Sequence, residues 1–219
     1  MAAPNRKEFI SELADALDAF GIEQLTAEQA LGLERHYRMM IEWNRLLNLT
    51  RITALDEAVR FHYAESLLGG RFIGSSRTAL DIGSGAGFPG VPLAVLRPDV
   101  AFTALESNGK KAAFLMEVKH ALALENFNVA NARLEGFDLS AYDLLMSRAL
   151  DRACDVLPMI AAKLNTGQRL IVYCGQDLLE AISVVLGGDS LSELLTIPES
   201  KSRLIAVFTP TRLSKGASS

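Results

Sequence analysis

The sequence predicts an α/β fold: a mostly parallel, doubly wound sheet with an antiparallel hairpin at one edge and a helical extension at its N-terminal side. Three observations predict it. Apolar residues recur at helical spacing over the first 70 residues. From Arg77 on, short apolar runs alternate with helical stretches, as in parallel strands joined by crossover helices. Near the C-terminus, two strand-like runs flank a short turn.

The N-terminal extension is predicted to hold three helices. The first stops at Gly21 and has apolar residues at helical spacing, which are Phe9, Ile10, Leu13, Leu17 and Phe20. The second opens at Thr26, and its buried stripe is predicted to comprise Leu33, Tyr37, Met40, Ile41 and Trp43. The third is expected to run from an N-cap at Asp56 to about Leu68 and to end at Gly69 and Gly70.

The rest of the chain is predicted to alternate strands and helices. Strands are expected at 78–82, 102–105, 127–130, 144–146, 170–173, 191–197 and 204–208. Helices are expected at 89–96, 109–122, 152–163 and 178–186. The last two strands flank the turn at 198–202, which favours antiparallel pairing at one edge of the sheet. We divide the chain into a helical extension (1–70), a sheet domain (71–213) and a disordered tail (214–219).

Composition narrows the class of protein. Hydrophobic residues make up 49% of the 219 residues and charged residues 22%, which is ordinary for a soluble globular protein. No apolar run approaches the roughly 18–20 residues that a membrane helix needs, and the N-terminus lacks the apolar core of a signal peptide. The two cysteines, Cys154 and Cys174, belong to no CxxC pair, so we expect neither disulfides nor a metal site. We therefore expect a cytoplasmic protein.

The most informative stretch runs from Asp81 to Gly90 and reads DIGSGAGFPG. A predicted strand ends at Ile82, and glycines then occupy alternate positions. Glycine permits positive φ and leaves no Cβ in the way of a ligand. The next helix begins near Pro89, a residue favoured in a first turn. Ligands of open α/β sheets bind at such a place, beyond the carboxyl end of a strand.

Two interpretations of this loop are open. A dinucleotide fingerprint, GxGxxG, starts at Gly85, but its first glycine should lie directly after the strand, where Gly83 stands. From Gly83, an acid, an apolar residue and GxGxG, including Gly87, resemble the S-adenosylmethionine loop of Rossmann-like methyltransferases. That cofactor carries an ammonium group and no pyrophosphate, so an acid such as Asp81 beside the loop suits it.

Two later strand ends add to this second interpretation. Glu106 follows the second strand, close to the spacing expected for an acid that binds the ribose hydroxyls. Arg133, Leu134 and Glu135 follow the third strand and are positioned to meet the adenine.

Further motifs carry a resemblance to one family. They are Trp43-Asn44 with Asn48-Leu49-Thr50, His62 with Ser66, Asp81 through Gly90 with Pro92-Leu93, Arg97-Pro98, Ser107 with Gly109-Lys110-Lys111, and Ser147-Arg148-Ala149. On these motifs the chain resembles the bacterial small-subunit ribosomal RNA methyltransferase G family, also called glucose-inhibited division protein B. The resemblance covers roughly residues 43–175.

The resemblance implies a Rossmann-like class I methyltransferase that uses S-adenosyl-L-methionine, releases S-adenosyl-L-homocysteine and methylates guanine N7 of 16S ribosomal RNA. Guanine N7 has a free lone pair and no proton, so the transfer needs no general base. With the loop chemistry above, the predicted cofactor-binding residues are Asp81, Gly83, Gly85, Gly87, Phe88, Glu106, Leu134, Glu135 and Arg148. The predicted RNA-binding residues are Lys110, Lys111 and Arg148, and Arg148 is also the candidate for positioning the reactants.

The expected partner is 16S ribosomal RNA or a precursor of the small ribosomal subunit, bound by a monomer without any membrane. The chain departs from the family pattern at Glu65, where aspartate is usual, and at Cys174 and near Thr209, where lysine is expected. The two missing lysines lower the positive charge available to RNA. A small-molecule methyltransferase and a non-catalytic adenosylmethionine- or RNA-binding module therefore remain alternatives.

Two structural expectations concern motif residues. His62 lies one helical turn before Glu65, which predicts a hydrogen bond between them. Trp43 and Asn48 are expected to mark a helix end that packs on the sheet domain.

Overall fold

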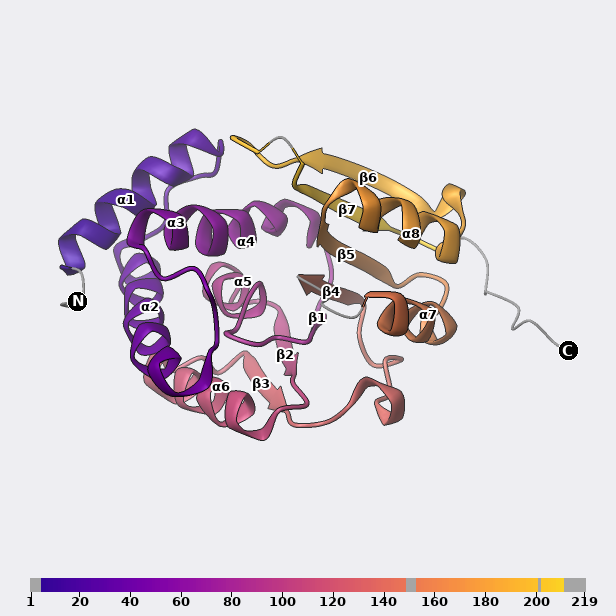
Figure 1. The fold of residues 1–219 in the computed structure, drawn as a ribbon, viewed down its shortest axis with the longest axis horizontal. Coiled ribbons are helices and arrows are strands. Elements are labelled where there is room, and N and C mark those ends of the chain that lie inside the picture. Colours follow the sequence, from indigo (N-terminus) through magenta and orange to yellow (C-terminus); the bar gives the residue numbers. More distant parts are fainter. Residues whose placement is uncertain (1–4, 149–152, 201, 211–219) are drawn as a thin grey trace, which may run out of the picture.

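A seven-stranded sheet in the order β3-β2-β1-β4-β5-β7-β6 forms the middle of the protein (Figure 1). This computed structural model describes residues 5–148, 153–200 and 202–210. The strands are β1 Thr78–Ile82, β2 Ala101–Leu105, β3 Phe127–Ala130, β4 Leu144–Arg148, β5 Arg169–Cys174, β6 Leu191–Thr196 and β7 Leu204–Phe208. Strands β1 to β5 pair parallel, and β7 pairs antiparallel with both β5 and β6. The predicted parallel sheet with an antiparallel hairpin at one edge is confirmed.

Helices cover both faces of the sheet, as a doubly wound fold requires (Figure 1). One face carries α1 Arg6–Ala19, α2 Ala27–Leu47, α5 Gly90–Leu96, α6 Gly109–Leu122 and the helical run from Leu55 to Phe72. The other carries α7 Ala153–Lys163 and α8 Gln176–Leu186. Successive strand residues alternate between the two hydrophobic clusters, with Ala79 in one and Leu80 in the other.

The end of the first helix and the start of the second lie where the sequence predicts. Phe20 caps α1 and Gly21 follows it in a left-handed conformation with φ 62°. Thr26 is the N-cap of α2 and forms a capping box with Gln29. The extension and one face of the sheet share a single hydrophobic cluster, in which Phe9 and Leu33 are buried together with Phe102 and Phe114.

The third predicted helix differs from its prediction at its N-cap and in its internal geometry. It is a continuous helical run made of α3 Leu55–Ala58, a π-helical segment Val59–Ala64, α4 Glu65–Leu68 and a 3₁₀ turn Gly69–Phe72. Asp56 is wrong as the N-cap, because Ala54 holds that position and Asp56 lies in the first turn, where its charge still favours the helix.

The predicted α-helical end is confirmed, because α4 ends at Leu68 with Gly69 as its C-cap, although a 3₁₀ turn continues to Phe72. Gly69 and Gly70 also allow close packing. A Cβ on Gly69 would lie 1.9 Å from the hydroxyl oxygen of Tyr173, and one on Gly70 would lie 2.7 Å from Leu96 Cδ2. The same Tyr173 hydroxyl donates to the carbonyl oxygen of Ser66 at 3.0 Å. The absence of side chains at these two positions therefore lets the helix approach β5 and α5.

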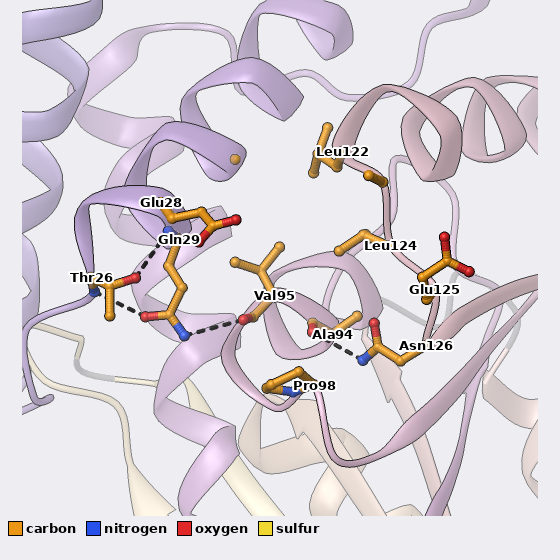
Figure 2. A pocket seen from close by; sticks show the side chains of 12 residues that line it. Thr26, Glu28, Gln29, Ala94, Val95, Pro98, Leu122, Leu124, Glu125 and Asn126 are labelled. Carbon is orange, nitrogen blue, oxygen red and sulfur yellow. Dashed lines mark hydrogen bonds between the residues drawn. The ribbon is translucent and has the colours of Figure 1, made fainter.

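The N-terminal end of α2 is hydrogen-bonded to α5 beside a cavity of about 400 Å³ (Figure 2). Gln29 accepts from the backbone N–H of Thr26 at 2.9 Å, and its Nε2 donates to the carbonyl oxygen of Val95 at 3.2 Å. Across the cavity, Asn126 donates to the carbonyl oxygen of Ala94 at 3.1 Å. The amide groups beside this cavity thus already have partners within the protein, and we assign it a structural role.

Gln29→Ala should therefore lower the free energy of unfolding by about 1–2 kcal/mol, since it removes half of a capping box and a hydrogen bond between two elements. The matched control is Glu28→Ala, an exposed neighbour in the same helical turn, which should cost less than about 0.5 kcal/mol. Urea unfolding of both variants measures this. Equal losses would show that the bond to Val95 contributes nothing.

Candidate functional site

The glycine loop joins β1 to α5 at the carboxyl edge of the parallel strands. Gly83, Gly85 and Gly87 have φ of 73°, 57° and 94°, a region that L side chains rarely adopt. A Cβ on Gly87 would lie 2.7 Å from Val91 Cγ2, so Gly87 allows close packing below the loop. A Cβ on Gly83 would meet nothing within 4 Å, so Gly83 leaves open space above the loop.

Asp81 stabilises the glycine loop through hydrogen bonds from the end of β1. Its side chain is buried, and Oδ2 accepts from the hydroxyl of Ser84 and from the backbone N–H of Gly90, the latter at 3.0 Å. Burial raises the pKa of Asp81 to about 6, while these two hydrogen bonds oppose the rise. Its Oδ1 is buried and has no hydrogen-bond partner among the described residues. Asp81 thus ties the end of β1 to the start of α5, and its predicted contact with a cofactor stays a prediction.

Glu106 connects the end of β2 to the same loop. Its Oε2 accepts from the backbone N–H of Gly85 at 3.0 Å, and its Oε1 accepts from the N–H of Asn108 at 2.8 Å. Each carboxylate oxygen can accept a second hydrogen bond. The carboxylate therefore fixes the loop and keeps capacity for further donors, and its predicted contact with ribose hydroxyls stays a prediction.

A cavity of about 210 Å³ opens beside Gly83, and we call it the loop cavity. Its lining residues come from the ends of β1 and β2, from the segment after β3 and from α7; they are Ile82, Gly83, Leu105, Ser107, Ala132, Arg133, Leu134, Glu135, Val156 and Met159. Three predicted cofactor residues, Gly83, Leu134 and Glu135, thus come together in its wall. Asp81, Gly85, Gly87, Phe88 and Glu106 lie outside this lining and shape or support the loop.

Phe88 is buried inside the protein, behind the loop. Its ring stacks on that of His62 at 4.6 Å between centroids, and the rings of His36 and Tyr63 each lie 5.1 Å away. The guanidinium carbon of Arg148 lies 4.9 Å from the centre of the Phe88 ring. Phe88 therefore joins the glycine loop to the N-terminal helices and to the end of β4.

His36 of α2 is a site residue that the sequence interpretation missed. Its Nε2 donates to the carbonyl oxygen of Ala86 in the loop at 2.9 Å, and its Nδ1 accepts from the hydroxyl of Tyr63 at 3.0 Å. Burial lowers the pKa of His36 to about 4, so the ring is neutral at pH 7. The only sequence signal is that His36 occupies a buried position beside Tyr37 in the helical stripe.

Arg148 ends β4 and is fixed by the helical run. Its Nη1 donates to the carbonyl oxygen of Phe61 at 2.7 Å, and its Nη2 donates to Nδ1 of His62 at 2.9 Å. Because arginine only donates, His62 must accept at Nδ1 and carry its proton on Nε2. That Nε2 donates to Thr50 Oγ1 at 2.8 Å. Burial and the charge of Arg148 lower the pKa of His62 to about 3, which agrees with a neutral ring.

The predicted hydrogen bond between His62 and Glu65 is wrong. His62 turns to Thr50 and Arg148, whereas Glu65 Oε2 accepts from Arg203 Nη2 at 2.6 Å. The π-helical segment Val59–Ala64 lies at this point, so the spacing of an ideal α-helix does not apply.

The expectation for the end of α2 is confirmed. The Trp43 ring lies 5.7 Å from that of Phe114 in α6, and Asn48 caps α2 with φ 47°. The intervening Asn44 accepts from the backbone N–H of Thr50 at 2.8 Å, which extends the hydrogen bonds around His62.

Another cavity, of about 360 Å³, lies at the carboxyl ends of β4 and β5, and we call it the strand-end cavity. Its lining combines apolar, acidic and basic side chains; they are Ile52, His62, Glu65, Arg148, Tyr173, Cys174, Gly175, Leu178, Ile197 and Arg203. Glu65 is 1% exposed, and burial raises its pKa to about 7 against the opposing effect of Arg203. Glu65 and Arg203 were not among the predicted site residues, and only the fold, which pairs β7 with β5, brings Arg203 here.

The predicted RNA-binding lysines lie at the same edge of the sheet, because α6 follows β2. Lys110 is exposed and Lys111 half-buried, and the Asn108 side chain accepts from the backbone N–H of both. Ala149 of the Ser-Arg-Ala motif and the predicted disordered tail at 214–219 lie outside the described residues.

The two positions that lack the expected lysine lie at opposite ends of the sheet. Cys174 lines the strand-end cavity and also packs with Leu179 on the α8 side, and burial raises the pKa of its thiol to about 11. Thr209 follows β7, whose last residue Phe208 pairs with Leu170 at the start of β5. Only the replacement at Cys174 therefore removes a charge near the two cavities.

Within the described ranges, no cluster of three or more His, Cys, Asp or Glu side chains is placed to hold a metal ion. Over those same ranges, none of the helices has the length and apolar character needed to cross a bilayer.

Sheet order and the glycine loop define a Rossmann-like methyltransferase fold. The structure resembles an S-adenosylmethionine-dependent methyltransferase from Aquifex aeolicus with a TM-score of 0.55 at 14% identity, over 70% of this chain and 93% of that one. It also resembles an O-methyltransferase from Thermotoga maritima with a TM-score of 0.57 at 14% identity, over 79% and 72% of the two chains. These similarities establish the fold class.

The chain belongs to the GidB family, rRNA small subunit methyltransferase G, whose family model matches residues 29–185. Ribosomal RNA small subunit methyltransferase G of Xanthomonas campestris pv. campestris strain 8004 is 38% identical over 183 residues, 83% of this chain and 84% of the relative. The protein of that name from Xanthomonas euvesicatoria pv. vesicatoria is 36% identical over 190 residues, 84% of this chain and 89% of the relative. The family resemblance carried by the motifs is thus confirmed, and the chain is a methyltransferase.

The buried His36 should make stability depend on pH. Its folded pKa of about 4 lies below the usual 6.5, so between these values the unfolded state takes up a proton that folded His36 does not. Acidification from pH 6.5 to 5 should therefore remove ~2 kcal/mol of stability through this residue.

His36→Gln abolishes this titration, so the stability difference between wild type and variant should shrink by that amount as the pH falls. Urea unfolding of both proteins at several pH values measures the difference. The titrations of His62, Glu65 and Asp81 contribute equally to both proteins and therefore cancel in it. Parallel pH profiles would contradict the neutral, buried state of His36.

Proposed function

We propose that this protein transfers the methyl group of S-adenosylmethionine to N7 of a guanine in 16S ribosomal RNA. One observation carries the proposal: the loop cavity at the ends of β1 and β2 and the strand-end cavity at the ends of β4 and β5 lie at the same edge of the sheet, where β1 and β4 are neighbours, and Arg148 lines the strand-end cavity. A donor and an acceptor can therefore be bound next to each other. The family and its relatives are named for the ribosomal small subunit, and the motif resemblance supplies guanine N7.

The residues of the loop cavity fit the cofactor. Gly83 leaves room for a ligand against the backbone, and Leu134 and Glu135 offer an apolar wall and an acceptor for the adenine. Glu106, fixed by two backbone N–H groups, is the ribose ligand in this proposal. Gly85, Gly87 and Phe88 act through the shape of the loop. The free Oδ1 of buried Asp81 is an acceptor suited to an ammonium group.

Bound S-adenosylmethionine would supply an electrophilic methyl group. The chain's own contribution is orientation, which can lower a barrier by roughly 7–11 kcal/mol in favourable cases. Arg148 is held rigidly by Phe61 and His62, and its charge is suited to a phosphate, guanine O6 or the cofactor carboxylate. Neutral His62 adds no second positive charge beside a purine that becomes cationic.

We assign Lys110, Lys111 and Arg148 to RNA, either free 16S RNA or RNA in a small-subunit precursor. The net charge of −4 does not oppose this, since these cations gather at one edge of the sheet. We further propose that the protein acts as a monomer in the cytoplasm.

Incubation with radiolabelled S-adenosylmethionine tests the function directly. Small ribosomal subunits and naked 16S RNA from cells that lack this protein should accept label, which nucleoside analysis should identify as N7-methylguanosine. Label confined to metabolite mixtures would establish the small-molecule alternative. No transfer to any substrate, despite cofactor binding, would establish a non-catalytic module.

Gly83→Ala should weaken the binding of S-adenosylhomocysteine at least tenfold, because the methyl group and the strained backbone change the wall of the loop cavity. Gly167→Ala is the matched control: Gly167 also has positive φ, 93° against 73°, and no atom within 4 Å of its added Cβ. Both variants should lose about 1 kcal/mol of stability, but only Gly83→Ala should lose affinity. Calorimetric titration of both variants with S-adenosylhomocysteine measures the two affinities. Equal affinities would show that Gly83 is not part of the cofactor site.

A further inference from the structure

The strand-end cavity holds one feature that the proposed mechanism does not use. Glu65 lines this cavity and is 1% exposed. Its Oε2 is bound by Arg203, but its Oε1 is buried and has no hydrogen-bond partner among the described residues. A buried carboxylate oxygen without a partner is costly, which favours a donor that arrives with a ligand.

The cavity has the size and walls of a site for a planar base. Its volume of about 360 Å³ lies in the range of small-molecule sites. Ile52, Leu178 and Ile197 supply apolar surface, while Glu65, Arg203 and Arg148 supply charged groups. A nucleotide that is swung out of its RNA strand is bound in this way, with apolar contacts on its faces and hydrogen bonds on its Watson–Crick edge.

Resting on the function proposed above, we infer that Glu65 selects guanine by accepting hydrogen bonds from the N1–H and N2 amino groups of the target base. Once ionised, the Glu65 carboxylate only accepts hydrogen bonds, and the two adjacent donors on the Watson–Crick edge of guanine favour this ionised form. Adenine presents an acceptor at N1, which would face the carboxylate unfavourably. Inosine keeps N1–H but lacks the amino group, so it should bind with intermediate affinity.

The order of the strands bears on how a bound guanine is oriented. Arg203 directly precedes β7, and β5 separates β7 from β4, where Arg148 lies. Neighbouring strands are about 4.8 Å apart, so the backbone of Arg203 lies on the order of 10 Å from β4. Its side chain reaches Glu65, and Arg148 lines the same cavity. N7 lies across the purine from N1 and the amino group, so a guanine bound to Glu65 by its Watson–Crick edge can turn N7 toward Arg148.

Titration of the folded protein with guanosine, inosine and adenosine 5′-monophosphates, with S-adenosylhomocysteine present, tests this selection. We expect wild type to bind the guanosine nucleotide about tenfold or more tighter than the adenosine nucleotide, as loss of charge-assisted hydrogen bonds implies. Glu65→Gln should abolish this preference, because an amide places a donor against a donor. Glu65→Asp should restore most of it.

The matched control is Glu199→Gln, which alters the exposed ion pair of Glu199 with Arg60 at 2.7 Å and should keep the preference. The affinity for S-adenosylhomocysteine should stay within about twofold in all variants, whereas methyl transfer to small subunits should fall at least tenfold in Glu65→Gln.

Equal binding of the three nucleotides by wild type would overturn the inference, even if Glu65→Gln failed to fold. An unchanged preference in a folded Glu65→Gln would also overturn it and leave the proposed function intact. Conversely, a guanosine preference that depends on Glu65, in a protein that labels no ribosomal RNA, would support the base site and refute the proposed substrate.

Discussion

The hydrogen bond from His36 to the carbonyl oxygen of Ala86 is the interaction on which the site depends most. Three glycines with positive φ give the loop its open backbone, but also many alternative conformations. His36 fixes the loop from α2, Asp81 fixes it from β1 and Glu106 fixes it from β2. The N-terminal helices therefore stabilise one conformation of the glycine loop through their buried face.

The elements of the fold were predictable wherever local pattern decides. The boundaries of β1, β3, β7 and α6 were correct because apolar periodicity and glycine positions mark them in the sequence itself. The helical run from Leu55 to Phe72 was predicted less well, since no local pattern marks its π-helical segment, and the close approach of Ser66 and Gly69 to Tyr173 joins residues more than 100 positions apart. Local propensity contains no information on such a contact.

The site divides in the same way. Glycine positions and strand-end acids predicted a cofactor loop, since their spacing along the chain reflects the chemistry that such a loop needs. The chemistry of the strand-end cavity depends on two hydrogen-bonded pairs. Glu65 and Arg203 are 138 residues apart in the sequence, and Arg148 and His62 are 86 residues apart. Neither Glu65 nor Arg203 stands out from the sequence alone, and the pairing of β7 with β5 brings Arg203 to this edge of the sheet.

The charge at this edge also explains how an acidic protein can act on RNA. Arg203 is partly neutralised by Glu65, and Cys174 supplies no cation where its relatives are expected to have lysine. In the function proposed above, Lys110, Lys111 and Arg148 carry most of the phosphate attraction, and few phosphate contacts mean a shallow dependence of affinity on salt. Selectivity would then come from short-range contacts. In that proposal the base is distinguished in the strand-end cavity, where Oε1 of Glu65 is buried and has no hydrogen-bond partner among the described residues.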